Sequence, residues 1–113
     1  MEREDFTFAE ALFTEARERD PYRAEIYINL GNAYQGQKKW KLAIQMFEKA
    51  ASFDENNPNG YYNIGLLYYT EMKDYDQAQA YLLKARDRRP NDKNIVNYLG
   101  LVMYEISKRE TKE

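Results

Sequence analysis

Three glycines recur along the chain at nearly constant spacing, and this repetition limits the fold more than any other feature. Gly31, Gly65 and Gly100 are separated by 34 and 35 residues, and each follows a large aliphatic residue. Three alanines recur at the same two intervals: Ala9, Ala43 and Ala78. Self-similarity of this period indicates one supersecondary unit repeated along the chain, whose copies bury their apolar faces against their neighbours.

The residues around each alanine predict an amphipathic helix. A large apolar residue follows each alanine by four positions and a second alanine follows by seven, as in Ala43, Phe47 and Ala50. These residues share one helix face, and a mid-helix glycine allows a neighbouring helix to approach closely. Each of the three prolines marks the start of a new helix. We therefore expect six antiparallel helices, near residues 4–19, 23–36, 40–53, 58–72, 75–88 and 92–110, with the extra residue of the second interval in the connection at 71–74.

The stretch Tyr27-Ile28-Asn29-Leu30-Gly31-Asn32-Ala33-Tyr34, followed by Trp40, Ala43, Phe47 and Ala50, resembles the tetratricopeptide repeat. The resemblance implies an all-α solenoid of helical hairpins coiled into a right-handed superhelix. The first predicted helix matches the second half of the motif, and the last matches the first half. We expect two complete repeats flanked by two half repeats, in a single domain over residues 1–113.

Composition argues against catalysis and against several classes of ligand. The chain has 17 basic and 19 acidic residues, a balance that does not favour nucleic-acid or anionic-membrane binding. It has no cysteine and no histidine, which removes disulfides, the common nucleophiles and the usual zinc ligands. We predict no enzyme activity, no cofactor and no metal. No apolar run reaches the length of about 18 residues that spans a membrane, and the N-terminus lacks the order of a signal peptide, so we expect a soluble chain of unknown compartment.

In this family, the resemblance implies, the first helices of successive repeats line a concave groove that holds a peptide or a partner helix. Counted from the three glycines, ten residues face this groove: Ile28, Asn32, Gln35, Tyr62, Asn63, Leu66, Tyr69, Asn97, Leu101 and Tyr104. Asparagine can pair with a peptide backbone, and tyrosine offers a large rigid surface with a hydroxyl at its tip. We predict a protein-interaction scaffold. Two structural alternatives stand beside it: the asparagines form local hydrogen bonds, or an additional helix covers the tyrosine row.

Chaperone adaptors of this family hold a C-terminal carboxylate with lysines, arginines and two asparagines. The asparagines match Asn32 and Asn63, but the cationic positions hold Ile28, Asn94 and Tyr98. Each missing charge-assisted hydrogen bond costs about 1.5–3 kcal/mol, so we predict weak or no binding of acidic chaperone tails.

The first and last helices are apolar on more than one face. These residues either wrap the adjacent hairpin or meet another molecule. The second possibility makes the chain an assembly module that forms homo-oligomers through its end helices, or a natural or engineered fragment of a longer array. The residues predicted for self-association are Phe8, Leu12, Ile95, Tyr98 and Val102.

Overall fold

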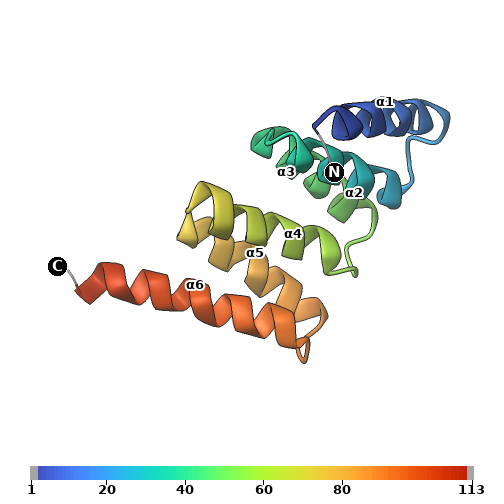
Figure 1. Cartoon of the computed structure of the whole chain (residues 1–113). Coiled ribbons are helices and arrows are strands. Elements are labelled where there is room, and N and C mark those ends of the chain that lie inside the picture. The colour runs from blue at the N-terminus through green and yellow to red at the C-terminus, as the bar shows by residue number, and fades with distance from the viewer. Residues whose placement is uncertain (1–2, 112–113) are drawn as a thin grey trace. The chain divides into compact units, whose positions relative to one another are not determined.

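The computed structural model describes residues 3–111, and these residues form helices with no β-strand among them (Figure 1). The α-helices are α1 (Arg3–Arg19), α2 (Ala24–Gly36), α3 (Trp40–Phe53), α4 (Asn59–Leu67), α5 (Tyr75–Arg88) and α6 (Lys93–Thr111). A π-helical segment, η1 (Tyr68–Met72), continues α4 without a break. With η1 counted as part of α4, every helix begins and ends within one residue of the bounds predicted from the sequence.

The chain divides into two compact units. Unit 1 is Met1–Glu55 and holds α1, α2 and α3, whereas unit 2 is Asn56–Glu113 and holds α4, α5 and α6. The single domain expected over 1–113 stays a prediction. Within residues 3–111, no helix has the length and apolar character that crossing a membrane requires.

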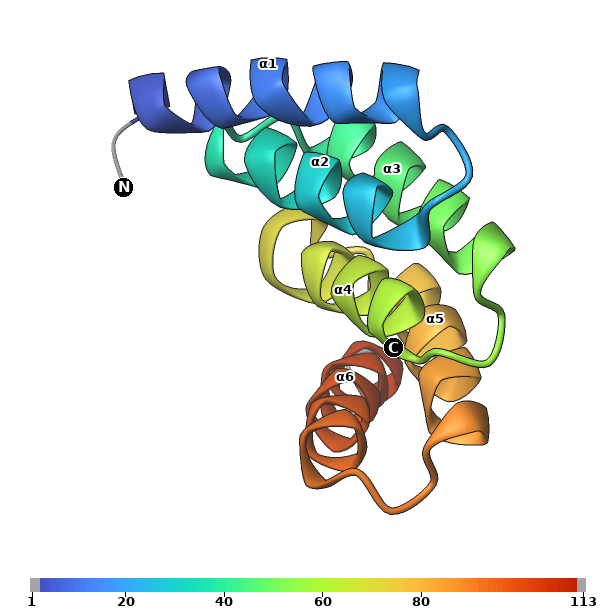
Figure 2. The same ribbon diagram turned by 90° about the vertical axis from the view of Figure 1, so that its right-hand side faces the viewer.

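In unit 1, α2 packs against both α1 and α3 (Figure 2). The contact with α3 depends on Gly31, because a Cβ built there would lie only 2.4 Å from Cε1 of Phe47. Phe47 is fully buried, and Ala43 and Ala50 on the same face of α3 are buried with it. On the other side of α2, the ring of Phe6 from α1 packs against Gly36. These contacts confirm the predicted packing roles of the repeat residues in this unit.

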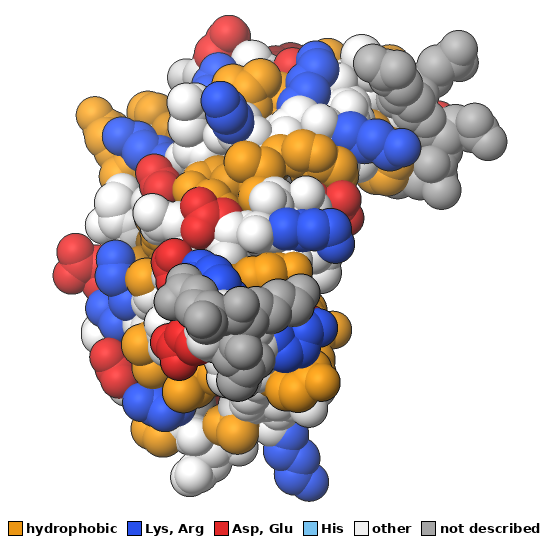
Figure 3. Space-filling model, turned by 90° about the vertical axis from the view of Figure 1, so that its left-hand side faces the viewer, with side chains coloured by type: hydrophobic (Ala, Val, Ile, Leu, Met, Phe, Trp, Pro, Cys, Tyr) orange, Lys and Arg blue, Asp and Glu red, His pale blue; other side chains and the backbone are white. Residues whose placement is uncertain are grey.

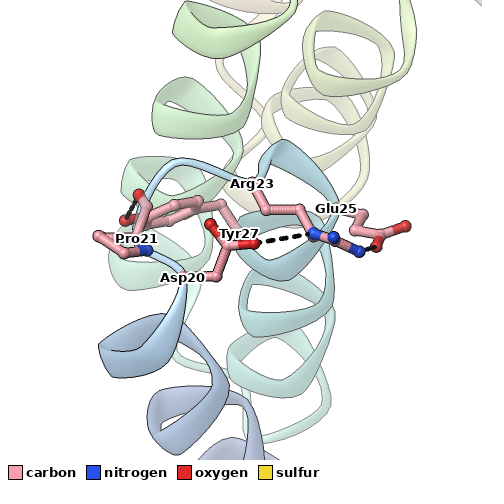
Figure 4. A network of polar contacts seen from close by, with 5 residues as sticks. All are labelled: Asp20, Pro21, Arg23, Glu25 and Tyr27. Carbon is pink, nitrogen blue, oxygen red and sulfur yellow. Dashed lines mark hydrogen bonds and ion pairs between the residues drawn. The ribbon is translucent and has the colours of Figure 1, made fainter.

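A small polar network fixes the connection between α1 and α2 (Figure 4). The hydroxyl of the buried Tyr27 donates a hydrogen bond to the carbonyl oxygen of Pro21, at 2.7 Å. The guanidinium of Arg23 pairs with Asp20 at 3.2 Å and with Glu25 at 2.8 Å. The ring of Pro21 restricts the backbone. Together with these polar contacts, it favours one backbone conformation between α1 and α2.

In unit 2, α5 packs against both α4 and α6. Gly65 repeats the role of Gly31, since a Cβ there would lie 2.8 Å from Cγ of Leu82. Leu82 is fully buried, and the core continues into α6 through Leu99 and Val102. The third glycine behaves differently, because a Cβ at Gly100 would meet no atom within 4 Å.

The extra residue of the second interval is absorbed by the π-helical segment. In unit 1, the backbone N–H of Lys39 reaches back five residues to the carbonyl of Tyr34, at 2.9 Å. At the equivalent place in unit 2, the N–H of Asp74 reaches back six residues to the carbonyl of Tyr68, also at 2.9 Å. Both connections contain one residue in the left-handed region, Lys38 (φ 63°) and Lys73 (φ 54°). The connection keeps its geometry, and the last turn of the helix widens to hold the insertion.

Candidate binding surface

Three tyrosines from three segments of unit 2 form a cluster on the face that the glycine register predicts. The ring of Tyr98, from α6, lies 6.2 Å from the ring of Tyr62 on α4 and 6.1 Å from that of Tyr69 on η1, both edge to face. Tyr69 also lies 6.0 Å from Tyr75, the first residue of α5. Such T-shaped pairs are a favoured aromatic geometry. We name Tyr62, Tyr69 and Tyr98 the tyrosine cluster.

The tyrosine cluster is half-buried and packs against the core of unit 2. Tyr98 of α6 therefore covers part of Tyr62 and Tyr69. Burial, with smaller contributions from Tyr98 and Asp92, raises the pKa of Tyr62 above its usual value. The neutral phenol is therefore the favoured form in the folded chain.

The exposed part of the predicted face lies mostly on α6. Tyr104 is 61% exposed, and Leu101 and Asn97 are exposed on the same side of the helix. The ammonium group of Lys108 lies 5.2 Å from the centre of the Tyr104 ring, within the range of a cation–π contact. On α4, Asn63 and Leu66 are half-buried. Among the predicted groove residues of unit 2, those on α6 are therefore the most exposed.

A hollow of about 180 Å³ lies between the first turns of α4 and α6. Its lining residues are Pro58, Asn59, Tyr62, Asp92, Asn94 and Ile95. Small-molecule pockets usually enclose about 300–1,000 Å³, so this hollow has the size for one side chain of a partner. Asn59 and Asp92 were not assigned to a site from the sequence. Both residues lie close after a proline that starts a helix, and this position was the only sign of a site in the sequence. Asparagine and aspartate are also common at helix starts because they cap them, so the sign does not indicate binding by itself.

The predicted residues of unit 1 lie on one face of α2. Asn32 and Gln35 are exposed, and Ile28 is half-buried. Their spacing of four and three residues places the side chains along a single helical stripe. This stripe offers two amide groups beside one aliphatic side chain, and it contains no cation.

The residues predicted for self-association do not form one exposed surface. Ile95 and Val102 are buried in the core of unit 2, and Tyr98 belongs to the tyrosine cluster. The apolar pattern of α6 does not tell which side of the helix faces α5, and these three residues face inward. Phe8 and Leu12 of α1, in contrast, are 69% and 52% exposed.

The exposed side chains of these surfaces are aromatic, aliphatic and amide groups. Among the side chains that the structure describes, no group of three carboxylates is arranged to hold a metal ion, and the chain contains no histidine or cysteine. In the space-filling view, acidic and basic side chains are interspersed with hydrophobic ones (Figure 3). The available interactions are aromatic and aliphatic contact together with amide hydrogen bonds.

Comparison with known proteins gives a consistent result. Two family models, each described as the tetratricopeptide repeat, match residues 24–57 and residues 58–92. The first tetratricopeptide domain of the human RPAP3 protein is 18% identical, with a TM-score of 0.83 over 96% of this chain and 84% of that chain. The first such domain of Spaghetti (RPAP3), bound to the HSP90 peptide SRMEEVD, is 19% identical, with a TM-score of 0.81 over 90% and 82% of the two chains.

A third structure comes from a bacterial secretion system. It is the Yersinia enterocolitica type III secretion chaperone SycD in complex with a peptide of the translocator YopD. This protein is 18% identical, with a TM-score of 0.77 over 96% of this chain and 83% of that chain. At such identities the likeness concerns the fold.

Proposed function

Because this chain belongs to the tetratricopeptide repeat family and has its all-α helical-repeat fold, we propose that it is a non-catalytic protein-interaction module. In this proposal, unit 2 binds a peptide segment or a helix of another protein on the face shared by α4 and α6. The stripe of Ile28, Asn32 and Gln35 on α2 offers a second contact surface in unit 1.

The observation that carries the proposal is the arrangement of Tyr104, Leu101 and Asn97. Two large apolar side chains stand exposed on one side of α6, next to an exposed amide. Aromatic anchors with adaptable polar neighbours are typical of surfaces that recognise proteins, since tyrosine contributes contact area at low entropic cost. The hollow beside Tyr62 and Asn94 adds a place for one partner side chain.

Two of the similar structures support a peptide as the ligand. The Spaghetti (RPAP3) domain is bound to an HSP90 peptide, and SycD is in complex with a YopD peptide. The acidic HSP90 peptide is a poor model for the ligand of this chain, because Ile28, Asn94 and Tyr98 stand where the resemblance calls for cations. An apolar or weakly charged segment that presents an aromatic or aliphatic side chain fits the described surface better.

The test compares partner capture by the native chain and by a variant with Leu101→Ala and Tyr104→Ala. Tyr62 and Tyr69 are poorer targets, because both pack against the core and their loss would disturb unit 2. The matched control is Met103→Ala. It also removes an exposed apolar side chain, next to Tyr104 in the sequence but on another side of α6. Loss of interface anchors typically costs about 2 kcal/mol or more, so we expect about 30-fold weaker binding of a captured partner.

A captured protein that binds the native chain and the Met103→Ala control equally, and the double variant at least tenfold more weakly, would support this surface as the site. Binding that survives in the double variant would contradict it. A parallel Asn32→Ala variant separates the contribution of unit 1, because it leaves unit 2 unchanged.

A further inference from the structure

One face of α6 is open where the equivalent faces of α2 and α4 are covered. Val96 and Met103 are 48% and 50% exposed, and a Cβ added at Gly100 between them would meet no atom within 4 Å. The spacing of four and three residues puts all three on one side of the helix. By the glycine register they correspond to Tyr27, Gly31 and Tyr34 of α2. In unit 2 they correspond to Tyr61 and Gly65 of α4 and to Tyr68 of η1.

The following helix covers this face in both units. In unit 1 the ring of Phe47 lies over Gly31, and in unit 2 the side chain of Leu82 lies over Gly65. The residue before Leu82 completes the contact, since the ring of Tyr81 stacks on that of Tyr68 at 5.8 Å. In both units the covering helix therefore places a large side chain over the glycine. In unit 2 the preceding residue, Tyr81, also packs against Tyr68, three residues after the glycine.

The first helix carries the same covering pattern on a face that is only partly covered. Ala9, Phe13 and Ala16 have the spacing of the covering residues of α3 and α5, which are almost completely buried, yet these three are only half-buried. Leu12 precedes Phe13 as Tyr81 precedes Leu82, and it is exposed. The contact of α1 with α2 uses other residues: Phe6 against Gly36, and Glu10, which accepts a hydrogen bond from Gln37 at 2.8 Å.

We propose that α6 of one molecule receives α1 of a second copy, so that the two helices complete one repeat between molecules. Phe13 then lies over Gly100, Leu12 packs against Met103, and Ala16 lies beside Val96. A hollow of about 440 Å³ bordered by α5 and α6, with Gln79, Met103 and Ser107 in its lining, extends this receiving face.

The two helices pair antiparallel, as consecutive helices of the repeat do. With Phe13 over Gly100, the first turn of α1 lies near the last turn of α6. The contact is heterologous, because each molecule uses two different surfaces, so it produces open chains or a ring and no isolated symmetric pair. The Leu101 and Tyr104 surface takes no part, and this inference is independent of the proposed function.

The test is sedimentation equilibrium over a concentration series, with two variants that each block one surface. Gly100→Leu fills the receiving face of α6, and Leu12→Glu charges the covering face of α1. Both should fold, since the first site is open and the second is exposed. Helical circular dichroism checks this, and Leu12→Lys replaces Leu12→Glu if the latter loses helicity. Leu42→Glu is the matched control, because it charges an equally exposed leucine on α3, outside both surfaces.

We expect the mass of the native chain and of the control to rise with concentration above 13.5 kDa. Each blocked variant should remain monomeric alone, whereas an equimolar mixture should form a dimer and nothing larger, through the unblocked α6 of one variant and the unblocked α1 of the other. A native chain that stays monomeric, a Gly100→Leu variant that still associates, or a mixture that stays monomeric would overturn the proposal. So would association that Gly100→Leu abolishes and Leu12→Glu leaves intact, because that result indicates pairing of α6 with itself.

Discussion

The three repeat glycines should respond very differently to the same substitution by alanine. At Gly31 the new Cβ would lie 2.4, 2.6 and 2.7 Å from three atoms of the fully buried Phe47 ring. Overpacking of this kind costs about 1–3 kcal/mol, and the better helix propensity of alanine returns up to about 1 kcal/mol. We expect Gly31→Ala to lower the free energy of unfolding by about 1–2 kcal/mol. Gly100→Ala has the same gain in helix propensity without a clash. It should therefore raise the free energy of unfolding by up to about 1 kcal/mol.

The measurement is urea unfolding at low protein concentration, followed by helical circular dichroism for both variants. The chain has one tryptophan, Trp40, at the start of α3, so its fluorescence reports unit 1 and isolates the effect of Gly31→Ala. Gly65→Ala serves as an intermediate case, because the nearest atom is Cγ of Leu82 at 2.8 Å and an aliphatic side chain can shift more easily than a ring. If Gly31→Ala stabilised the chain as much as Gly100→Ala, the close-packing argument would be refuted.

Three other results are expected. Asp92→Ala should lower the free energy of unfolding by about 1 kcal/mol in a urea titration, because Oδ1 of Asp92 accepts hydrogen bonds from the N–H groups of Asn94 and Ile95 at the start of α6; an unchanged midpoint would contradict this capping role. The pKa of Tyr62 is raised in the folded chain, chiefly by burial, so its stabilising effect is complete below the unfolded pKa of about 10 and is lost as the pH rises through the folded pKa. Unfolding followed from neutral to strongly alkaline pH should therefore show a fall in stability above about pH 10 that Tyr62→Phe reduces, and an identical fall in both proteins would exclude Tyr62 as a source. Finally, a titration with the peptide SRMEEVD should show weak or no binding, since Ile28, Asn94 and Tyr98 provide no cation for its carboxylates, and submicromolar affinity would contradict that interpretation.

The sequence predicted the helices well because the repeat constrains them twice, by local pattern and by spacing. The position of Gly65 relative to Leu82 follows from the same register that places Gly31 against Phe47. The spacing of 35 residues also indicated one extra residue. We expected that residue in the connection at 71–74, but the spacing alone does not distinguish a longer turn from a wider helix, since both preserve the register. The structure selects the π-helical segment, where Asp74 bonds the carbonyl of Tyr68 across six residues.

The candidate surface was harder to predict, because helical spacing gives the direction of a side chain and not what stands in front of it. Tyr62 and Tyr69 were correctly placed on one side of their segment, yet Tyr98 approaches them from α6, a helix that follows later in the chain. Its position was assigned to self-association from the apolar pattern of α6 alone. Such a pattern fixes how many sides are apolar, whereas the packing of α5 decides which of them is buried.

The open sides of α6 make separate roles for neighbouring residues physically reasonable. Met103 and Tyr104 are adjacent in sequence, so their side chains leave the helix about 100° apart, and both are largely exposed. A substitution at one of them need not disturb the other surface, because the buried Leu99 and Val102 hold the helix in place from a third side. If peptide binding depends on Leu101 and Tyr104 while assembly depends on Gly100 and Met103, the two activities must respond independently to these substitutions. Loss of both activities in Met103→Ala, with helicity retained, would mean that one surface serves both, and the division of α6 into two faces would be wrong.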